Sequence, residues 1–450
     1  MGIIHQIRDA GIVGCGGAGF PTHKKLSKDI EYFIVNGAEC EPLLRTDRYI
    51  MLHRAPDLVR AITALKAELN IAHCVIALKH HYQAEAEALR QAIQAAGADI
   101  TVHELESFYP AGDEQTIVYE VTGRVVPPAG IPMAVGAVVN NVATVCAIAD
   151  AMDGLPFTQK YLTVTGDVRC PTVLQVPIGT SYADCLELAG GPLARDYFIV
   201  NGGPMMGKPV TMEEARWAVV TKTTSGILVL PAGGYHARTH AVDLERMLQR
   251  ARSACIQCSA CTQLCPRHML GHPLQPHRIM RALSAPGGSL DDLLQDPVIQ
   301  NAQLCCECGI CETYACPMSL FPRKINSMLK KKLGAAGIRY QPPEGVQWQP
   351  SPHRPLRKAP SERVAARAGV RAYYDYEISQ CQVASPNRVE IPLQMHIGPP
   401  SVPLVSPGDQ VAVGTLIAQP PEGAAMGARI HASLGGRVES VGDRVVIVKE

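Results

Sequence analysis

Short apolar runs alternate with helical patterns over the first 150 residues of the chain. The runs at 33–35 and 74–78 are apolar throughout, which predicts buried strands. Residues 84–95 carry apolar side chains at helical spacing, and Gly97 follows as a stop signal. The uncharged run at 125–149 contains three prolines and an Asn-Asn pair, which predicts a buried strand, a polar turn and a buried helix rather than a membrane span. Strands alternating with helices predict a largely parallel sheet.

The pattern changes after residue 160. Residues 161–235 are rich in β patterns and contain one helical pattern at 182–188, which predicts a small α+β domain. Residues 243–254 predict a helix that leads into a cysteine-rich region. The Pro- and Arg-rich segment 336–372 predicts a semi-extended, solvated linker. Short β patterns with Gly and Pro turns across 373–450 predict a compact all-β domain.

Charge and the first residues narrow the class of protein. Lys and Arg number 42 against 41 Asp and Glu, a formal net charge of +1. Proteins that bind polyanions carry a basic excess, so nucleic acid is not an expected partner. The first residues lack a basic stretch followed by an apolar one, so no secretory signal is expected. We therefore expect a soluble, cytoplasmic protein whose cysteines stay reduced or bind metal.

Nine of the 16 cysteines fall within residues 255–316. The run from Cys255 to Pro266 has the spacing C-x2-C-x2-C-x3-C-P of bacterial ferredoxins. The run from Cys305 to Pro317 repeats it, with one extra residue before the last cysteine. In such pairs of runs the fourth cysteine of each binds the other cluster, so two 4Fe–4S clusters are predicted. The predicted ligands are Cys255, Cys258, Cys261 and Cys316 for cluster one, and Cys265, Cys305, Cys308 and Cys311 for cluster two.

Two alternatives in this region stay open. The spacing favours Cys305 over Cys306 as a ligand, but a register slipped by one residue would reverse the choice. A zinc site would need two cysteine pairs separated by a loop, whereas each run here offers three closely spaced cysteines and a Cys-Pro. Iron–sulfur ligation is therefore the preferred interpretation.

The segment 14–19 satisfies the pattern G-x-G-x-x-G. A dinucleotide-binding Rossmann loop needs a buried strand before it and a helix directly after it. Here the preceding residues are polar and Pro21 interrupts the expected helix start. Five glycines followed by Lys24 and Lys25 instead predict a loop whose backbone approaches an anionic ligand.

Four motifs, of which this loop begins the first, follow one another along the chain: Gly14-x-Gly-Gly-Ala-Gly-Phe-Pro-Thr22, Asn36-Gly-Ala-Glu-Cys-Glu-Pro42, Tyr109-Pro-Ala-Gly-Asp-Glu114 and Val139-Asn-Asn-Val-Ala-Thr144. They resemble the motifs of the NADH-oxidising flavoprotein subunit of respiratory complex I, and still more those of the C subunit of the Rnf complex. The resemblance implies that FMN contacts Gly14, Gly16, Gly17, Gly19, Lys25, Asn36, Tyr109, Gly112, Asp113, Glu114, Asn140, Asn141 and Thr144. It implies that Phe20, Glu39 and Glu41 lie on the NADH side.

The remaining domains extend the resemblance over nearly the whole chain. Residues 161–235 resemble the soluble-ligand-binding β-grasp (SLBB) domain that follows the flavin domain in these proteins. The segments 407–414 and 430–438 resemble a barrel-sandwich hybrid, without the lysine of a biotinyl or lipoyl carrier. This module is N-terminal in the Rnf C subunit and C-terminal here. That order resembles the family of cobalamin reductases from propanediol-utilisation microcompartments.

The implied fold class is multidomain α/β and α+β. It comprises a Rossmann-like FMN/NADH domain of complex I type, a β-grasp domain, a bacterial ferredoxin-like domain with two 4Fe–4S clusters and a barrel-sandwich hybrid. The expected boundaries are 1–155 for the FMN/NADH domain, 158–238 for the SLBB domain, 240–335 for the ferredoxin-type domain, 336–372 for the linker and 373–450 for the barrel-sandwich hybrid.

The resemblance implies an NADH-dependent flavoprotein reductase. Electrons pass from NADH through FMN and two clusters to cobalamin, which is reduced towards cob(I)alamin for coenzyme B12 recycling in 1,2-propanediol degradation. No residue is expected to act as a nucleophile. Cobalamin is expected as a transient substrate, because no Asp-x-His-x-x-Gly motif is present. An adenosyltransferase and microcompartment shell proteins are the implied partners, in a bacterial microcompartment and without membrane insertion.

Two other functions are considered. The alternative is an electron-transfer subunit of an Rnf-type NADH:ferredoxin oxidoreductase complex, although the moved β module and the missing helical tail count against it. A structural scaffold, in which the clusters only hold the fold together, would bind no FMN and show no NADH-dependent cluster reduction.

Overall fold

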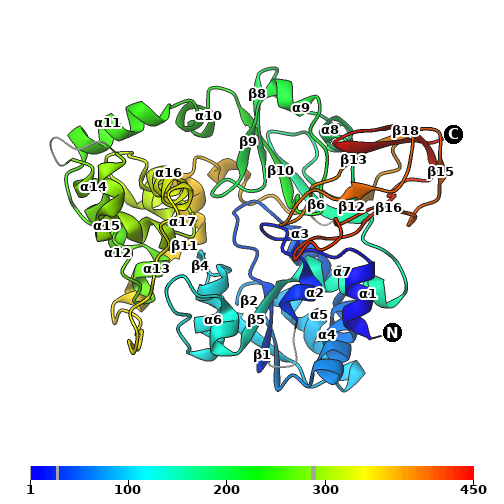
Figure 1. The fold of residues 1–450 in the computed structure, drawn as a ribbon, viewed down its shortest axis with the longest axis horizontal. Helices are drawn as coiled ribbons and strands as arrows, with labels where there is room; N and C mark the ends of the chain where they lie inside the picture. Colours follow the sequence, from blue (N-terminus) through cyan, green and yellow to red (C-terminus); the bar gives the residue numbers. More distant parts are fainter. Residues whose placement is uncertain (1, 27–29, 285–289, 379) are drawn as a thin grey trace.

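The N-terminal region folds around a parallel sheet. A computed structural model describes residues 2–26, 30–284, 290–378 and 380–450 (Figure 1). The sheet has the strand order β3-β2-β1-β5, and every pair is parallel. Its strands are β1 (Tyr32–Gly37), β2 (His73–Lys79), β3 (Thr101–Leu105) and β5 (Ala137–Asn141). The strands predicted at 33–35 and 74–78 lie within β1 and β2, so both predictions are confirmed.

Helices cover both faces of this sheet. They are α1 (Ile3–Asp9), α2 (Thr22–Lys25), α3 (Thr46–His53), α4 (Ala55–Leu69), α5 (Gln83–Ala96), α6 (Glu114–Thr122) and α7 (Val142–Met152). Helix α5 matches the predicted helix at 84–95 and ends at Gly97, whose φ of 58° favours glycine. The uncharged run at 125–149 contains β5 followed directly by α7, as predicted, and the Asn141 side chain caps α7 by accepting from the Ala143 amide at 2.9 Å.

The second region is a six-stranded mixed sheet with the order β12-β7-β6-β10-β8-β9. Its elements are β6 (Gln159–Gly166), β7 (Thr172–Pro177), α8 (Tyr182–Leu188), β8 (Tyr197–Asn201), β9 (Lys208–Val210), α9 (Met212–Ala215), β10 (Gly226–Pro231), α10 (Tyr235–His240) and β12 (Cys381–Val383). Helix α8 confirms the helix predicted at 182–188. Strand β12 comes from the C-terminal part of the chain and pairs in parallel with β7. The sheet is therefore completed by residues that the sequence analysis assigned to another domain.

The cysteine-rich region is helical. Its elements are α11 (Leu244–Ala254), α12 (Ala260–Gln263), α13 (Pro266–Met269), α14 (Pro276–Ala282), α15 (Pro297–Gln300), a π-helical turn (Ile310–Ala315) and α16 (Pro322–Ala335). Helix α11 confirms the predicted helix at 243–254, with Asp243 as its N-cap. Buried Ile279, Leu329 and Leu333 belong to a hydrophobic core that includes Cys265, Cys305 and Cys316. The predicted ligands thus lie on a packed scaffold.

The segment 336–372 differs from the solvated linker expected from its composition. Strand β11 (Ala359–Pro360) pairs with β4 (Phe108–Tyr109), and α17 (Ser361–Arg367) follows it. Ala359 and Val364 are buried in a core shared with Tyr109 and Cys308. In Figure 1 this segment lies between the sheet of the N-terminal region and the helices of the cysteine-rich region. The few apolar residues among its prolines and arginines are therefore an interdomain contact.

The C-terminal residues form two small antiparallel sheets, which confirms the all-β prediction. Their strands are β13 (Arg388–Pro392), β14 (Val402–Pro403), β15 (Gln410–Val411), β16 (Leu416–Gln419), β17 (Ile430–His431), β18 (Gly436–Val441) and β19 (Arg444–Val448), ordered β13-β19-β18-β15 and β14-β16-β17. This domain shares a hydrophobic core with the N-terminal region, and the Ile397 amide donates to the Gly19 carbonyl at 3.0 Å.

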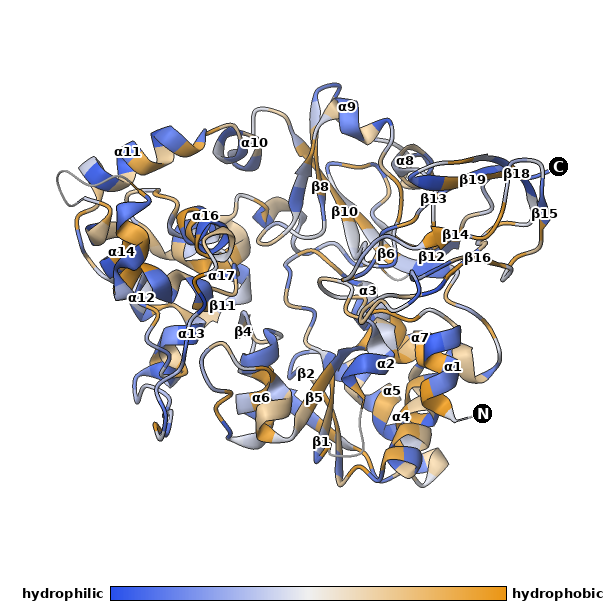
Figure 2. Ribbon diagram, in the orientation of Figure 1, coloured by the Kyte–Doolittle hydropathy of each residue, from blue (hydrophilic) through white to orange (hydrophobic). Residues whose placement is uncertain are grey.

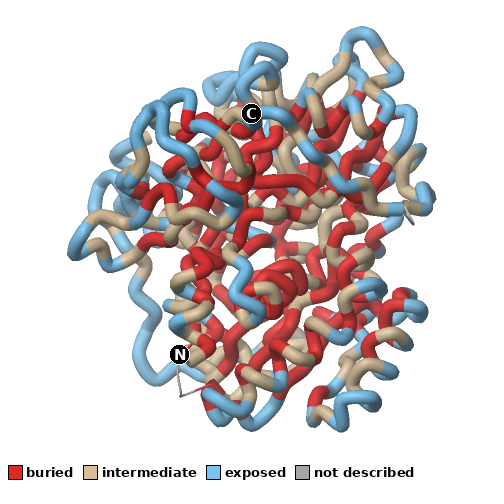
Figure 3. Tube along the Cα trace, turned by 90° about the vertical axis from the view of Figure 1, so that its right-hand side faces the viewer, coloured by how far each residue is buried: buried red, intermediate tan, exposed pale blue. Residues whose placement is uncertain are grey.

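Burial is continuous between the regions. Hydrophobic residues dominate the strands of the N-terminal sheet, and polar residues alternate with them along the surrounding helices (Figure 2). The buried part of the trace runs through the interior from one region into the next (Figure 3). No helix in the described ranges is long and apolar enough to cross a membrane.

Candidate functional site

The strand order creates a topological switch point between β1 and β5. The chain runs outward from β1 to β2 and β3, and then returns to place β5 on the other side of β1. In open α/β sheets, ligands bind beyond the carboxyl ends of the strands at such a point. Asn36 lies near the end of β1 and Asn141 ends β5, and the two residues pair in register. The predicted FMN residues of both motifs therefore converge there.

The glycine-rich loop lies over this switch point. The Cys15 amide donates to the Thr144 hydroxyl at 3.0 Å, which fixes the loop against the start of α7. A Cβ at Gly16 would lie 3.2 Å from the Asn141 side chain, so glycine is needed for this approach. Nothing lies within 4 Å of a Cβ built at Gly17, so the backbone there faces open space. The loop forms one wall of a cradle.

Lys25 and the motif at 109–114 form the other walls. The Lys25 ammonium donates to the Glu114 carboxylate at 2.7 Å and to the Val139 carbonyl at 3.0 Å. The Asn36 amide nitrogen donates to the Gly112 carbonyl at 2.8 Å. The structure thus brings together residues from all four sequence motifs, as the resemblance implied.

Two buried polar atoms at this place have no hydrogen-bond partner among the residues that the structure describes. They are the Asn140 amide nitrogen, at the end of β5, and the Thr22 hydroxyl, at the start of α2. An unpaired buried polar group costs about 1–3 kcal/mol, so such atoms indicate a ligand that pairs with them. Open backbone at Gly17, a nearby ammonium group and unpaired donors fit a phosphate-bearing flavin. The residues present therefore fit FMN.

Glu39 and Glu41, predicted on the NADH side, are turned inward. The Glu39 carboxylate accepts from the Asp47 and Arg48 amides, each at 3.1 Å, and so caps α3. The Glu41 carboxylate accepts from the Met205 and Met206 amides at 2.8 and 2.7 Å. Burial raises the pKa of Glu41 to about 7 and also raises the pKa of Glu39. Both oxygens of each carboxylate are engaged by backbone, so their role towards NADH stays a prediction.

Phe20 and Gly19 lie at the end of the loop. The Gly14 amide donates to the Phe20 carbonyl at 2.9 Å, and the Phe20 side chain is half-buried. Gly19 has a φ of 73°, and a Cβ there would lie 2.9 Å from the Met395 carbonyl of the C-terminal domain. The loop end is thus a domain contact as well as part of the cradle.

Tyr109 and Asp113 face the cysteine-rich region. The Tyr109 hydroxyl donates to the Cys308 carbonyl at 2.6 Å. The Asp113 carboxylate forms a bidentate pair with Arg267, at 2.5 and 2.9 Å, and also caps α6. Arg267 follows the predicted ligand Cys265 by two residues. Two residues assigned to FMN therefore join the flavin domain to the cluster-binding loops.

The thiols of the first predicted ligand set lie near one another. Burial, together with the neighbouring Cys316, Cys255 and Cys258, raises the pKa of Cys261 to about 12. Cys261 and Cys316 are buried, whereas Cys258 is exposed. Cys316 comes from the second run, so the crossed ligand pattern predicted from the spacing is compatible with this grouping.

The second set is more deeply placed. Burial raises the pKa of Cys311, to which Cys305 and Cys265 contribute. Burial and the neighbouring Cys306 raise the pKa of Cys265 and bring that of Cys305 to about 12. Iron binding must therefore displace protons from these thiols. Cys306 hydrogen-bonds Cys308, which lowers the pKa of Cys306. The choice between Cys305 and Cys306 as ligand stays a prediction.

The donor arrangement suits clusters. Within the described parts of the chain, no three Cys, His, Asp or Glu groups converge tightly enough to hold a single metal ion. Each thiolate of a 4Fe–4S cluster binds a different iron, so its four ligands surround a cluster rather than one ion. The two thiol groups fit this chemistry.

Several residues at the site were not singled out from the sequence. Asp47 accepts from the Asn141 amide nitrogen at 2.7 Å, and burial raises its pKa. Lys222 of the SLBB region donates to the carbonyls of Gly11 and Arg429, at 2.6 and 2.7 Å, and so joins three domains. Arg267 and Lys222 carry no motif signal, because their partners are distant in sequence.

Comparisons with known proteins agree with this architecture. Four family models match successive parts of the chain: the Nuo51 FMN-binding domain over residues 7–150, the SLBB domain over 161–209, the 4Fe-4S dicluster domain over 254–321 and the RnfC barrel sandwich hybrid domain over 372–450. They confirm the predicted multidomain fold class. The fold and these domains define a flavoprotein oxidoreductase that binds FMN and iron–sulfur.

Individual relatives narrow the class. The cobalamin reductase PduS of Salmonella typhimurium is 40% identical over 99% of this chain and 96% of its own length. The cobalamin reductase PduS of Citrobacter freundii is 38% identical over the same shares. The corresponding C component of a proton-translocating ferredoxin:NAD(+) oxidoreductase complex from Clostridium ljungdahlii is 35% identical over 58% of this chain and 55% of its own length. The chain belongs to the PduS family of cobalamin reductases.

Proposed function

We propose that the chain transfers electrons from NADH, through FMN and two 4Fe–4S clusters, to cobalamin. Cob(III)alamin or cob(II)alamin is reduced towards cob(I)alamin, for coenzyme B12 recycling during 1,2-propanediol degradation. Support comes from full-length relatives named cobalamin reductase and from the FMN-binding and 4Fe-4S dicluster domains. When bound, FMN accepts two electrons from a nicotinamide and releases them singly, as one-electron clusters require.

The chain's own residues divide this task. The glycine-rich loop, Lys25, Asn36, Asn140 and Thr144 hold FMN at the switch point. Phe20, Glu39 and Glu41 lie on the NADH side. The eight cysteines predicted from the spacing hold the two clusters, and none of the proposed roles needs a nucleophile.

One contact carries the proposal, the hydrogen bond from the Tyr109 hydroxyl to the Cys308 carbonyl. It joins the motif beside the switch point to the ligand loop of cluster two without intervening residues. Cluster two is therefore the first to receive electrons. Cluster one, whose Cys258 is exposed, lies nearer the surface and passes them on.

The test is an anaerobic titration of the purified holoprotein with NADH, followed by addition of cobalamin. We expect the flavin absorbance to bleach first, then the cluster absorbance, and the cob(I)alamin spectrum to appear last. Bleaching without cobalamin reduction would refute cobalamin as acceptor and leave the reaction class intact. No bleaching would refute NADH as donor.

The alternative, a subunit of an Rnf-type complex, has less support. The relative from the ferredoxin:NAD(+) oxidoreductase complex aligns over 58% of this chain, whereas the cobalamin reductases align over 99%. A location inside a bacterial microcompartment, with an adenosyltransferase and shell proteins as partners, follows from the same relatives. Co-purification of the chain with intact microcompartments tests that location.

A further inference from the structure

A cavity of about 340 Å³ lies between the SLBB region and the cysteine-rich region. Its walls come from the loop 204–207, the segment 235–242 that contains α10, Arg250 of α11 and the segment 312–324. None of these residues belongs to the predicted FMN, NADH or cluster ligands. The cavity is therefore separate from the cradle at the switch point.

The lining of the cavity is positively charged. It carries four side chains with positive charge, Arg238, Arg250, Arg323 and Lys324, against the single carboxylate of Glu312. Arg323 donates to that carboxylate at 2.8 Å, which neutralises it. The Arg238 guanidinium has no ion pair or hydrogen bond with the described parts of the chain, and the residue is exposed. The excess charge is thus free to meet an anion.

His236 adds a buried polar atom without a partner. The residue is 6% exposed, it lines the cavity, and its Nε2 has no hydrogen-bond partner among the described residues. Burial lowers the pKa of His236 to about 4, and the positive charges of Arg323 and Lys324 contribute to this shift. The hydrogen bond to the Ala368 backbone, which favours the protonated form, opposes it. The neutral ring leaves Nε2 as an acceptor for a ligand N–H.

The cavity also borders both cluster-binding segments. Glu312 and Thr313 directly follow the cluster-two ligand Cys311. Leu320, another lining residue, donates its amide to the Sγ atom of Cys316 at 3.4 Å. A ligand in this cavity therefore contacts residues bonded to, or hydrogen-bonded with, ligands of both clusters.

We propose that this cavity binds the electron acceptor through a phosphate group and an amide N–H donor. The inference rests on the proposed function, in which the acceptor is cobalamin, a molecule with one phosphodiester and peripheral carboxamides. The phosphate meets Arg238, and a carboxamide donates to His236 Nε2. The cavity is smaller than a whole corrinoid, so it takes the nucleotide arm and the adjoining edge. One electron then leaves a reduced cluster, and the cobalt falls by one oxidation state without any bond to the protein.

Equilibrium dialysis of oxidised holoprotein tests the proposal, with cobalamin and with cobinamide, which lacks the phosphate and nucleotide. In Arg238→Gln we expect Kd for cobalamin to rise about tenfold, as for loss of one charge-assisted hydrogen bond. We expect Kd for cobinamide to be unchanged. Lys324→Gln, at a second cation of the cavity, should weaken cobalamin binding in the same direction.

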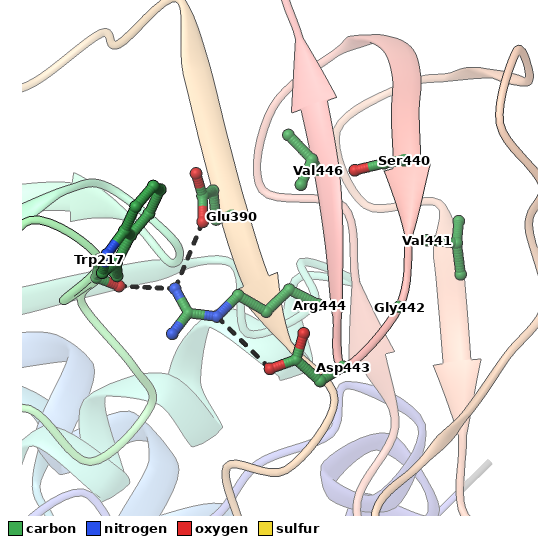
Figure 4. A pocket seen from close by; sticks show the side chains of 8 residues that line it. All are labelled: Trp217, Glu390, Ser440, Val441, Gly442, Asp443, Arg444 and Val446. Atoms are coloured by element: carbon green, nitrogen blue, oxygen red, sulfur yellow. Dashed lines mark hydrogen bonds and ion pairs between the residues drawn. The ribbon is translucent and has the colours of Figure 1, made fainter. Parts of the chain in front are cut away.

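Arg444→Gln is the matched control. Arg444 lines a different hollow, where its guanidinium donates to the Trp217 carbonyl at 2.6 Å and pairs with Glu390 at 3.3 Å (Figure 4). Loss of a partly exposed pair of this kind costs little. We expect this variant to bind both corrinoids like the wild type.

The outcomes separate this inference from the proposed function, because NADH-driven cobalamin reduction is measured in parallel. Wild-type reduction with unchanged cobalamin binding in Arg238→Gln overturns the cavity and leaves the function standing. Equal weakening of cobalamin and cobinamide overturns the phosphate contact. Weaker NADH-dependent flavin bleaching in Arg238→Gln assigns the cavity to the donor and also overturns the proposal. Phosphate-dependent binding without NADH-driven reduction supports the cavity and refutes the function.

Discussion

The Tyr109 hydroxyl donates a 2.6 Å hydrogen bond to the carbonyl oxygen of Cys308, and both residues are buried. Tyr109 belongs to the motif beside the flavin cradle, and Cys308 is a predicted ligand of cluster two. The β4–β11 pairing and the core around Val364 hold the two residues together. The flavin domain and the cluster domain are thus joined at the place where electrons would cross.

Tyr109→Phe is expected to slow electron transfer from flavin to cluster. The substitution leaves the buried Cys308 carbonyl without its donor, which costs about 1–3 kcal/mol and loosens the contact between the domains. In stopped-flow measurements with NADH, the flavin phase should be unchanged and the cluster phase slower. Tyr32→Phe, whose hydroxyl has no partner among the described residues, is the control. A slower flavin phase in Tyr109→Phe would show instead that Tyr109 acts on FMN.

Arg267→Met is expected to destabilise the protein by about 3 kcal/mol, because it leaves a buried carboxylate without its counter-charge. The Arg267 and Asp113 side chains are only 10% and 12% exposed. Adding Asp113→Asn should recover part of the loss, since the unpaired charge is then removed. Denaturant unfolding of the single and double variants measures this coupling. Additive losses would show that the pair does not act as a unit.

Asn140→Ala is expected to weaken FMN binding about tenfold with little change in the stability of the apoprotein. The Asn140 amide nitrogen has no partner among the described residues, so its removal breaks no protein contact there. Asn141→Ala, by contrast, loses both a helix cap and the bond to Asp47, and should lower apoprotein stability by about 1 kcal/mol. Flavin fluorescence titration and thermal unfolding distinguish the two effects. Unchanged FMN affinity in Asn140→Ala would contradict the proposed cradle.

Cys306→Ser is expected to keep both clusters, about eight iron atoms per chain, whereas Cys305→Ser should lose cluster two and keep about four. The reason is the x2-x2 spacing, which places Cys305, Cys308 and Cys311 in one register. Iron and sulfide analysis of anaerobically purified variants, with electron paramagnetic resonance of the reduced protein, measures the outcome. The reverse result would assign the slipped register.

Lys222 is expected to make stability rise with pH between about 7 and 10.5. Burial lowers its pKa from 10.5 to about 7, so the unfolded chain binds more protons than the folded protein in this range. The contribution is unfavourable below pH 7 and levels off above pH 10.5. Lys222→Met should flatten this part of the profile. It should also cost about 1–3 kcal/mol at high pH, because the buried Gly11 and Arg429 carbonyls lose their donor.

A denaturant series across pH tests Lys222, with Lys449→Met as the control at an exposed lysine. A slope in Lys222→Met equal to that of the wild type would show that another group controls this range. A slope of opposite sign in the wild type would contradict the lowered pKa itself.

Local pattern was enough for the parts of the molecule whose signal lies in neighbouring residues. The run at 74–78 became β2, the pattern at 84–95 became α5, and the Asn-Asn pair after an apolar run became the junction of β5 and α7. These elements are encoded by periodicity, caps and breakers within a few residues. The cysteine spacing indicated iron–sulfur ligation for the same reason.

What the tertiary structure alone decided are contacts between segments far apart in the chain. The Pro- and Arg-rich segment looked like a linker, because its few apolar residues form no period. Yet Ala359 and Val364 are buried in a core shared with Tyr109 and Cys308. Likewise β12 completes a sheet that begins more than 200 residues earlier.

The sequence by itself determined the domains, their order, the family and the chemistry of the cysteine runs, because each depends on residues that are close together in the chain. Only the tertiary structure decided that Glu41 is held by the Met205 and Met206 amides, that Asp113 pairs with Arg267, and that a positively charged cavity lies beside both ligand runs. Those features depend on which distant surfaces pack together. Packing between domains is set by shape and burial, which no local pattern records.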